Sequence, residues 1–293
     1  MEIKIFTAKD WQDYELLDTG EGEKLERFGK YVFVRPYEDA VWKKTLSEKE
    51  WNKVDGKFWS SKTGAKAGWK FQNKIPKQWE MSYNGIKFLA SPTPFRHLGF
   101  FPEQAPHWDL IEQKIKLYKV RPCKVLNLFG YTGVASIFAL KAGAEVTHVD
   151  ASKNILKWAK ENQDLSGLGK LPMRIIEDDA IKFLEREIKR GNKYDAVIMD
   201  PPKFGRGPKG ETWKIEEDLG VLLSKVRLVL SNDPLFVILT SYATDTSSLS
   251  LGNALSDAMK DLSGSVEQGE LCIKEKSNNR FISLANTAIW VRE

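Results

Sequence analysis

Short apolar runs alternate with amphipathic segments over the last two-thirds of the chain. Seven such runs predict strands, at Lys124–Phe129, Glu145–Asp150, Met173–Glu177, Tyr194–Asp200, Leu235–Thr240, Val266–Ile273 and Ala285–Val291. Segments with helical periodicity follow the first four runs, among them Gly133–Lys141 and Asn154–Gln163. Repeated strand–helix units are typical of an α/β fold whose mostly parallel sheet carries helices on both faces.

The last two predicted strands differ from the others, because only residues 274–284 separate them. That segment is too short for a crossover helix, so the two strands are expected to form an antiparallel hairpin at the edge of the sheet. The expected architecture is a seven-stranded, mostly parallel sheet with this hairpin at one edge.

Residues 1–91 follow another pattern, in which short β-branched and aromatic runs are broken by Gly, Pro and Lys. Asn84-Gly85 between two alternating runs predicts a tight hairpin, and a short helix is expected between Ala40 and Asp55. We therefore predict a small β-rich domain over residues 1–91 and a larger α/β domain over residues 92–293.

Composition adds a few constraints to this picture. At 293 residues, of which 42% are hydrophobic, the chain is long enough for two domains with buried cores. Its two cysteines, Cys123 and Cys272, belong to no CxxC pair, so neither a metal site nor a disulfide framework is expected. No apolar leader opens the chain, and no stretch reaches the ~18–20 apolar residues that cross a bilayer, so we expect a cytoplasmic protein without a membrane partner.

The first predicted strand of the α/β region runs into the loop "NLFGYTG". Gly130 and Gly133 allow the backbone to turn tightly against a ligand, and ligands bind at the carboxyl ends of parallel strands. Asp150, at the end of the second strand, is placed to accept hydrogen bonds from the hydroxyls of an adenosine ribose. After the third strand, Asp179 and its neighbour Ala180 are placed to reach an adenine.

A dinucleotide is the main rival ligand for this loop. Its diphosphate usually requires G-x-G-x-x-G, whereas here Phe129 stands where the first glycine would be. A ligand without phosphates fits the loop better. The alternative that Gly130 and Gly133 only make a turn, and that Asp150 is a solvated strand end, stays open at this point.

The fourth predicted strand ends in "DPPKF". Proline stiffens the backbone, so Asp200 and the carbonyl of Pro201 form a rigid pair of acceptors for an amino group, and Phe204 is placed to stack on a flat base. Lys203 and Arg206 are either phosphate contacts or solvated surface residues. The following stretch, residues 205–213, is predicted to be a flexible substrate loop.

The segments "NLFGYTG", "VDAS", "EDDA" and "DPPKF", in this order and spacing, resemble the class I S-adenosylmethionine (SAM)-dependent RNA methyltransferases. The resemblance is closest to bacterial ribosomal RNA methyltransferases with a DPPKF motif, and it covers about residue 91 to the last residue. The stretch "TPFRHLGFFPEQ" is similar to the segment that closes over the cofactor in that family. The opening stretch "LLDTGEGEKLERFGKY" resembles a subgroup with a small β-domain.

This resemblance implies a Rossmann-like methyltransferase fold, SAM as the cofactor and RNA, chiefly ribosomal RNA, as the partner. The residues expected to bind the cofactor are Phe101, Asn127, Phe129, Gly130, Thr132, Gly133, Asp150, Ala151, Ser152, Asp179, Ala180 and Asp200. The residues expected to act in catalysis are Asp200, Pro201, Pro202, Lys203 and Phe204.

One departure from the family concerns the target atom. Cytosine-C5 enzymes of this family resemble one another in a cysteine-containing motif after the fifth strand, whereas this chain has "ILTSYATD", with Ser241 and Tyr242 in the place of cysteines. An unactivated hydroxyl is a poor substitute for a thiolate nucleophile. We therefore expect a base nitrogen as the target, since an amino group needs only orientation and acceptors for its protons, and no metal.

The segment from Lys43 to Lys87 contains eleven lysines and no arginine against four acidic residues, a net charge of 11 − 4 = +7. It also carries Trp51, Trp59, Trp69 and Trp79. Lysines interleaved with aromatic residues favour RNA binding through phosphate contacts and base stacking. In the alternative reading, the tryptophans form the core of a small domain and the lysines keep its surface soluble.

Three functions follow from these patterns. A methyltransferase acting on a base nitrogen of ribosomal RNA comes first, and the basic β-rich domain favours it over a methyltransferase for a small molecule or a protein amide. A non-catalytic RNA-binding protein is the third, against which the joint presence of Asp150, Asp179 and Asp200 argues. His97 and His107 are expected to be structural or supporting residues. The sequence specifies no oligomeric state.

Overall fold

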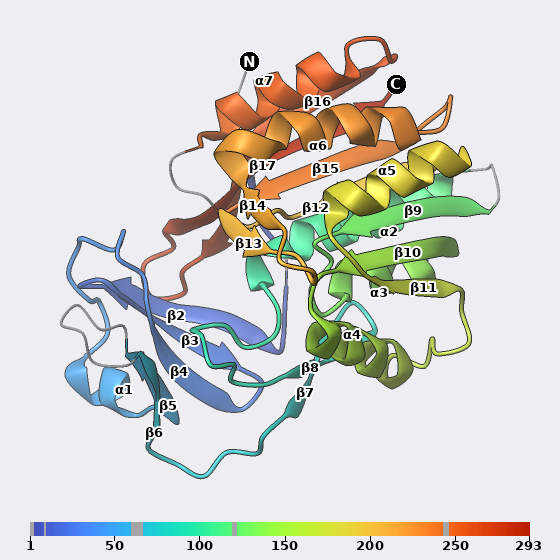
Figure 1. The fold of residues 1–293 in the computed structure, drawn as a ribbon. Coiled ribbons are helices and arrows are strands. Elements are labelled where there is room, and N and C mark those ends of the chain that lie inside the picture. Colours follow the sequence, from blue (N-terminus) through green and yellow to red (C-terminus); the bar gives the residue numbers. More distant parts are fainter. Residues whose placement is uncertain (1–2, 9, 60–66, 119–121, 243–245) are drawn as a thin grey trace. The chain divides into compact units, whose positions relative to one another are not determined.

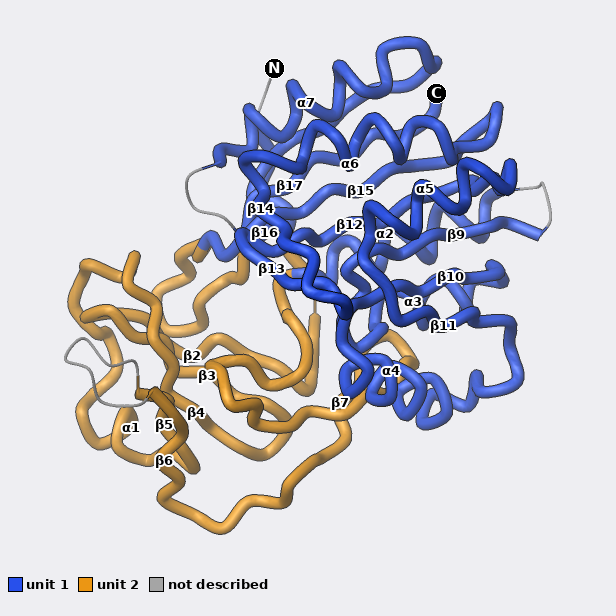
Figure 2. Tube along the Cα trace, viewed as in Figure 1, with its two compact units in different colours: residues 1–6, 104–271, 283–293 blue, residues 7–103, 272–282 orange. Residues whose placement is uncertain are grey.

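The computed structural model describes residues 3–8, 10–59, 67–118, 122–242 and 246–293. The chain divides into two compact units that interleave along the sequence (Figure 2). The sheet unit comprises residues 1–6, 104–271 and 283–293, and the β-rich unit comprises residues 7–103 and 272–282. Each unit is thus built from more than one stretch of the chain, whereas the sequence predicts a single boundary at residue 91.

The sheet unit contains one eight-stranded sheet (Figure 1). Its strands lie in the order β1 (Ile3–Phe6), β16 (Gly264–Lys274), β17 (Phe281–Arg292), β15 (Phe236–Ser241), β12 (Ala196–Met199), β9 (Cys123–Leu128), β10 (Ala144–Asp150) and β11 (Met173–Glu177). The strands from β15 to β11 are parallel, and β17 runs antiparallel to β15. The expected Rossmann-like fold is confirmed. The sheet has one strand more than predicted, because β1 pairs in parallel with β16, so the predicted hairpin of β16 and β17 is not at the edge.

Helices cover both faces of this sheet (Figure 1). One face carries α2 (Ala105–Leu117), α3 (Val134–Lys141) and α4 (Lys153–Leu165), and the other carries α5 (Ala180–Arg190), α6 (Ile215–Val229) and α7 (Ser248–Met259). Neighbouring strand residues point to opposite faces, so Val125 packs with α2 and α3 while Leu126 packs with α5, α6 and α7. Both faces of the sheet are apolar, which explains why the strand sequences are continuous apolar runs. The pattern did not predict α2.

The β-rich unit contains a five-stranded sheet and a separate hairpin. The sheet order is β2 (Tyr14–Gly20), β3 (Glu23–Phe28), β4 (Tyr31–Pro36), β5 (Gly56–Trp59) and β6 (Gly68–Phe71). The hairpin joins β7 (Trp79–Tyr83) to β8 (Ile86–Ala90). Asn84 and Gly85 both have positive φ, at 44° and 78°, as the predicted two-residue turn requires. The expected short helix is α1 (Glu48–Asn52), which a capping box from Ser47 begins.

An ion cluster lies in the interior of the β-rich unit. The Glu26 carboxylate accepts two hydrogen bonds of 2.7 Å from Arg35 and one of 2.8 Å from the Tyr14 hydroxyl, and the Lys24 Nζ lies 3.3 Å away. Burial alone would raise the pKa of Glu26, but the charges of Arg35 and Lys24 and these hydrogen bonds outweigh it and lower the pKa to about 2.

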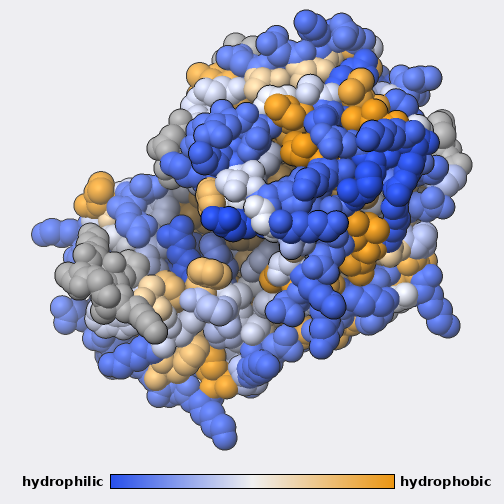
Figure 3. Space-filling view, viewed as in Figure 1, coloured by the Kyte–Doolittle hydropathy of each residue, from blue (hydrophilic) through white to orange (hydrophobic). Residues whose placement is uncertain are grey.

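The face of the molecule seen in Figure 3 is mainly hydrophilic and carries small, separate hydrophobic patches. None of the helices in the described part of the chain is long and apolar enough to cross a membrane. The described residues also contain no group of three or more His, Cys, Asp or Glu side chains arranged to hold a metal ion.

Candidate active site

Three neighbouring strands of the sheet unit end at the same level. Leu128 of β9 pairs with Val149 of β10 on one side and with Met199 of β12 on the other. The residues that follow these three, Phe129, Asp150 and Asp200, therefore leave the sheet together at its carboxyl edge. The chain proceeds from β9 to β10 on one side, whereas β12 enters on the other, and such a switch point is where open α/β sheets bind ligands.

The loop between β9 and α3 has an unusual backbone. Phe129, Tyr131 and Gly133 all have left-handed φ values, at 56°, 51° and 83°, although side chains rarely adopt this region. A Cβ atom on Gly130 would lie 2.3 Å from the His148 imidazole, so only glycine fits there. Gly133 is the N-cap of α3, which leaves the first N–H groups of that helix directed toward the carboxyl edge.

A buried chain of hydrogen bonds supports this loop from below. The Asn127 amide donates to the Ser136 hydroxyl at 2.9 Å, Ser136 lies 2.9 Å from His148 Nδ1, and His148 Nε2 lies 3.1 Å from the Tyr131 carbonyl. A carbonyl only accepts, so Nε2 carries the proton and Nδ1 accepts from Ser136. Burial lowers the pKa of His148 to about 4, which keeps the ring neutral and this tautomer fixed.

This network gives a supporting role to two residues, Asn127 and Thr132, that were predicted to bind the cofactor. Asn127 is buried beneath the loop, so its visible contact supports the backbone that a cofactor would touch. Thr132 is also buried, and its carbonyl accepts a 2.9 Å hydrogen bond from Asn162 of α4. Sequence reasoning missed His148 and Asn162, because a polar side chain inside a strand or helix carries no local sign of its partner.

The carboxylate of Asp150 is held in one orientation by backbone groups. Its Oδ2 accepts from the Tyr131 N–H at 3.0 Å, and its Oδ1 accepts from the Ser152 N–H at 2.9 Å. Burial raises the pKa of Asp150, and the backbone donors partly offset that effect. Each carboxylate oxygen can accept a second hydrogen bond, so the geometry fits a pair of ribose hydroxyls. The adjoining Ala151 and Ser152 lead into α4 at this edge.

Asp179 has a clear structural part as the N-cap of α5, since its carboxylate accepts the Lys182 N–H at 2.9 Å. Ala180 is the first residue of that helix. The preceding residue connects this region to the ribose site, because the Asp178 N–H donates to the Asp150 carbonyl at 3.1 Å. An adenine contact from Asp179 stays a prediction.

The DPPKF turn follows β12 directly and is clamped from outside. The Trp213 indole N–H donates to the Pro202 carbonyl at 2.6 Å, and the Ile215 N–H donates to the Lys203 carbonyl at 3.1 Å. Residues 205–213 do not form the expected flexible loop. They belong largely to a hairpin of β13 (Phe204–Arg206) and β14 (Thr212–Lys214), whose backbone pairing orders the segment.

The side chains of this turn differ in exposure. Phe204 is 54% exposed, so its ring face is available for stacking, and the Arg206 guanidinium lies 5.9 Å from its centroid. Pro201 is buried and Lys203 is exposed, at 4.0 Å from the Glu216 carboxylate. Lys203 and Arg206 are therefore surface cations beside the turn.

Gln104 is a further side chain that contacts Asp200. The Gln104 amide donates to the Asp200 carboxylate at 3.2 Å and to the Tyr242 hydroxyl at 3.3 Å. The sequence pattern assigned no role to Gln104, although this residue ends the stretch "FFPEQ", which resembles part of the segment that closes over the cofactor. Phe101 of the same stretch belongs to the β-rich unit, where its ring packs on His97 with centroids 4.9 Å apart.

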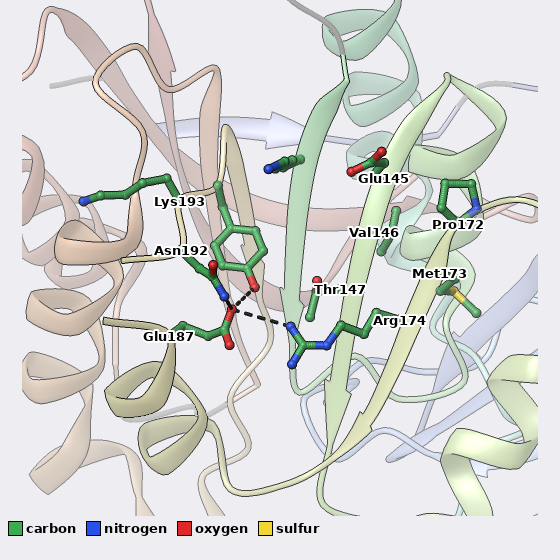
Figure 4. A pocket seen from close by; sticks show the side chains of 11 residues that line it. Glu145, Val146, Thr147, Pro172, Met173, Arg174, Glu187, Asn192 and Lys193 are labelled. Carbon is green, nitrogen blue, oxygen red and sulfur yellow. Dashed lines mark hydrogen bonds and ion pairs between the residues drawn. The ribbon is translucent and has the colours of Figure 1, made fainter. Parts of the chain in front are cut away.

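A cavity of about 460 Å³ lies at the opposite, amino ends of β9, β10 and β11 (Figure 4). Its buried carboxylate, Glu187, accepts 2.7 Å hydrogen bonds from Tyr194 and Asn192 and pairs with Arg174 at 3.6 Å. Burial would raise the pKa of Glu187, but these partners lower it instead. The carboxylate is thus already neutralised, and the cavity lies away from the edge where the loops of the site converge.

Comparisons with known proteins agree with this geometry. A family model described as "Conserved hypothetical protein 95" matches residues 107–233. The crystal structure of a SAM-dependent methyltransferase from Agrobacterium tumefaciens is 40% identical and covers 99% of this chain and 94% of its own, with a TM-score of 0.94. A Streptococcus mutans protein described as a SAM-dependent methyltransferase shares the fold at 15% identity, with a TM-score of 0.75 over 97% of this chain and 76% of its own.

Two curated relatives match part of the chain. The ribosomal RNA large subunit methyltransferase K/L of Pseudoalteromonas atlantica is 36% identical over 149 residues, which are 50% of this chain and 20% of that protein. The ribosomal RNA large subunit methyltransferase I of Aeromonas hydrophila is 43% identical over 121 residues, which are 41% of this chain and 29% of that protein. The chain thus spans less than a third of the length of either relative.

The chain belongs to the SAM-dependent methyltransferases, and SAM is its cofactor. The site fits SAM, because the loop at Gly130 has no room for a side chain and the carboxylate of Asp150 is oriented to bind the hydroxyls of a ribose. The individual residues assigned to the cofactor and to catalysis stay predictions, which the arrangement around β9, β10 and β12 supports.

Proposed function

We propose that this enzyme transfers the methyl group of SAM to a base nitrogen of RNA, with ribosomal RNA as the substrate. The observation that carries the proposal is the rigid DPPKF turn. Its first residue, Asp200, follows Met199, and Met199 pairs with Leu128, the last residue of β9 before the cofactor loop. An acceptor carboxylate, a carbonyl and an exposed aromatic ring thereby lie at the edge of the sheet where the loop after β9 begins. The names of the two curated relatives support the choice of ribosomal RNA, which would place the enzyme in the cytoplasm.

When bound, SAM supplies a methyl group on a sulfonium, which keeps the electron pair of the broken C–S bond as the amino nitrogen bonds to carbon. The chain's own residues orient the nucleophile and receive its proton. Asp200 and the Pro201 carbonyl accept the N–H groups of the amino nitrogen, and Phe204 stacks on the base. Trp213 holds the Pro202 carbonyl, so the acceptors keep their position.

A base nitrogen fits this site better than cytosine C5, which needs a thiolate nucleophile. Ser241 is 1% exposed and lies within β15, so its hydroxyl does not face a substrate. Cys123 is buried at the amino end of β9, opposite the site, and Cys272 is buried in the β-rich unit. Neither thiol is placed for attack on a base.

The surface of the β-rich unit supports an RNA partner. Trp51 and Trp69 donate indole hydrogen bonds within the unit, and Trp79 stacks on Phe33, so these rings serve the core. Trp59 is 56% exposed, with the Lys57 ammonium 5.8 Å from its ring. Trp59 is therefore the tryptophan best placed to stack on a base.

Turnover tests the proposal directly. Purified enzyme and radiolabelled SAM are incubated with ribosomal subunits and with deproteinised ribosomal RNA, and the product is mapped by mass spectrometry. Asp200→Ala should lower turnover by about a hundredfold or more while SAM affinity stays within a few-fold. Asp257→Ala, on the exposed face of α7, serves as the control. Methylation of a protein or a small molecule instead of RNA would refute the proposal.

The lysine-rich segment is tested by the salt dependence of RNA binding. About four phosphate contacts give a log–log slope near −3, so affinity should fall roughly sixtyfold between about 50 and 200 mM salt. Reversing Lys53, Lys70 and Lys74 to Glu should flatten the slope and leave SAM binding unchanged. These three lysines are exposed and form no ion pair with another described residue. Lys62 and Lys66 of the same segment lie outside the described residues.

The matched control reverses three exposed lysines of the sheet unit, Lys170, Lys189 and Lys260. It makes the same change in net charge, so a general electrostatic effect would appear in both variants. An equal slope before and after reversal of the β-rich lysines would mean that they only keep the surface soluble.

A further inference from the structure

Gln104 occupies a helix N-cap without capping the helix. It ends the short helix η1 (Pro102–Gln104) and precedes α2, and its side chain makes no capping hydrogen bond. Ser, Thr, Asp and Asn are the residue types that stabilise an N-cap. The Gln104 amide instead extends to Asp200 and Tyr242, so helix stability does not account for its presence.

The orientation of this amide follows from its neighbours. A carboxylate only accepts hydrogen bonds, so the NH₂ group of Gln104 must face Asp200. The amide oxygen then faces His107 Nδ1 at 2.8 Å, and that nitrogen has to carry a proton. Burial lowers the pKa of His107 to about 3, so the ring is neutral and carries only one N–H. Its Nε2 then accepts the single proton of the Thr287 hydroxyl, 3.1 Å away, which this hydroxyl would otherwise donate to the Leu239 carbonyl at 3.0 Å.

The other tautomer would produce a conflict. Nε2–H of His107 would donate to the Thr287 hydroxyl, which would in turn donate to the Leu239 carbonyl at 3.0 Å, so the conflict arises only at Nδ1. The bare Nδ1 would then face the Gln104 oxygen, or a flipped amide would turn that oxygen toward Asp200. Both arrangements place two acceptors in contact at a partly buried site, which is unfavourable.

We propose that Gln104 is a positioning residue for methyl transfer and that His107 locks it in the orientation that donates to Asp200 and Tyr242. The proposal rests on the proposed function, because it concerns Asp200 as the acceptor for the substrate amino group. One planar amide bridges the residues that follow β12 and β15, which are neighbouring parallel strands. The Asp200 oxygen thereby keeps a fixed place relative to Tyr242, and a shift of about 1 Å costs ~10²-fold in rate.

Substitution of Gln104 tests the first half of the proposal. Gln104→Glu keeps the shape but cannot donate to Asp200, and Gln104→Met removes all hydrogen bonding. Both should lower kcat about a hundredfold, with KM for RNA within about threefold and SAM affinity unchanged. Gln113→Met, an exposed glutamine on α2, is the matched control. Unchanged kcat, or a loss explained by weaker SAM binding, would overturn the proposal.

Substitution of His107 tests the lock. In His107→Asn the side-chain amide can donate from the position of the histidine Nδ1, whereas in His107→Gln it donates from the position of Nε2. His107→Asn should therefore keep about tenfold more kcat than His107→Gln, at similar thermal stability. Equal activity of the two variants would show that the ring only fills space.

Nitrogen NMR of the resting enzyme gives a readout that needs no substrate. The His107 Nδ1 should show the shift of a protonated nitrogen and Nε2 the shift of a bare one, and the Gln104 amide protons should exchange slowly. A protonated Nε2 would overturn the lock whatever the substrate is. If the enzyme methylates no RNA while NMR shows the Nδ1–H form, the proposed function fails and the lock stands.

Discussion

Gly130 leaves room for the imidazole of His148, which holds the cofactor loop against the sheet. A single added methyl group would meet that ring at 2.3 Å, and the ring cannot retreat because both of its nitrogens are hydrogen-bonded. The loop therefore requires glycine at position 130, because any side chain there would collide with the His148 ring.

Gly130→Ala should destabilise the protein by about 1–3 kcal/mol through this overpacking and weaken SAM binding. Gly220→Ala is the control, because Gly220 lies inside α6 on its exposed face with no atom within 4 Å of a new Cβ. That change should stabilise by about 0.5–1 kcal/mol. Urea denaturation and calorimetry give both quantities, and equal stability of the two variants would rule out the close packing.

Asp150 is the residue on which SAM affinity should depend most directly. Asp150→Ala removes a charged acceptor from two ribose hydroxyls, which should cost about 1.5–3 kcal/mol, or roughly tenfold to a hundredfold in affinity. Calorimetric titration with SAM measures the effect, with Asp257→Ala as the control. Wild-type affinity in Asp150→Ala would remove Asp150 from the cofactor site.

At the scale of elements, the hairpin of β13 and β14 acts as a clamp on the DPPKF turn. Trp213 of β14 donates to the Pro202 carbonyl, and its ring also packs on Phe129 of the cofactor loop, with centroids 5.0 Å apart. One side chain thus connects the DPPKF turn to the loop between β9 and α3.

Trp213→Phe removes the indole N–H and keeps an aromatic ring. We expect kcat to fall about tenfold through a looser turn, at a stability cost of about 1 kcal/mol for the lost hydrogen bond. Trp158→Phe on α4 is the control, because the Trp158 indole N–H has no partner among the described residues. If both substitutions had the same effect on turnover, the clamp would have no part in positioning.

At the scale of the whole molecule, the buried cluster at Glu26 makes stability depend on pH. The folded-state pKa of about 2 lies below the ordinary value of 4.5, so the cluster stabilises the fold above pH 4.5 and loses this contribution as pH falls toward 2. The shift corresponds to roughly 3 kcal/mol.

Glu26→Gln should destabilise the β-rich unit at pH 7, because it removes the carboxylate that pairs with the buried Arg35 at 2.7 Å. The difference between variant and wild type should shrink between about pH 4.5 and 2, since the wild-type carboxylate is protonated over that range. Urea unfolding followed by tryptophan fluorescence at several pH values measures it. A difference that does not change with pH would mean that the carboxylate carries no charge in the fold.

Much of the fold could be predicted because strand and helix periods are local properties of the chain. The strand–helix repeats and the hairpin at Asn84-Gly85 both depend on near neighbours in sequence. The expected flexible loop at residues 205–213 was wrong, since backbone pairing between Phe204 and Lys214 orders it. The eighth strand was missed because residues 3–6 pair with residues 268–271, far away in sequence.

By itself, the sequence determined the α/β class, the placement of Asp150 and Asp200 at strand ends and the stiffness of the two prolines, because periodicity and backbone restriction act over a few residues. Only the tertiary structure decided which side chains surround those carboxylates. Gln104 reaches Asp200 across 96 residues and His107 reaches Thr287 across 180. Such contacts follow from strand register and helix packing, which bring distant segments together without any local mark in the chain.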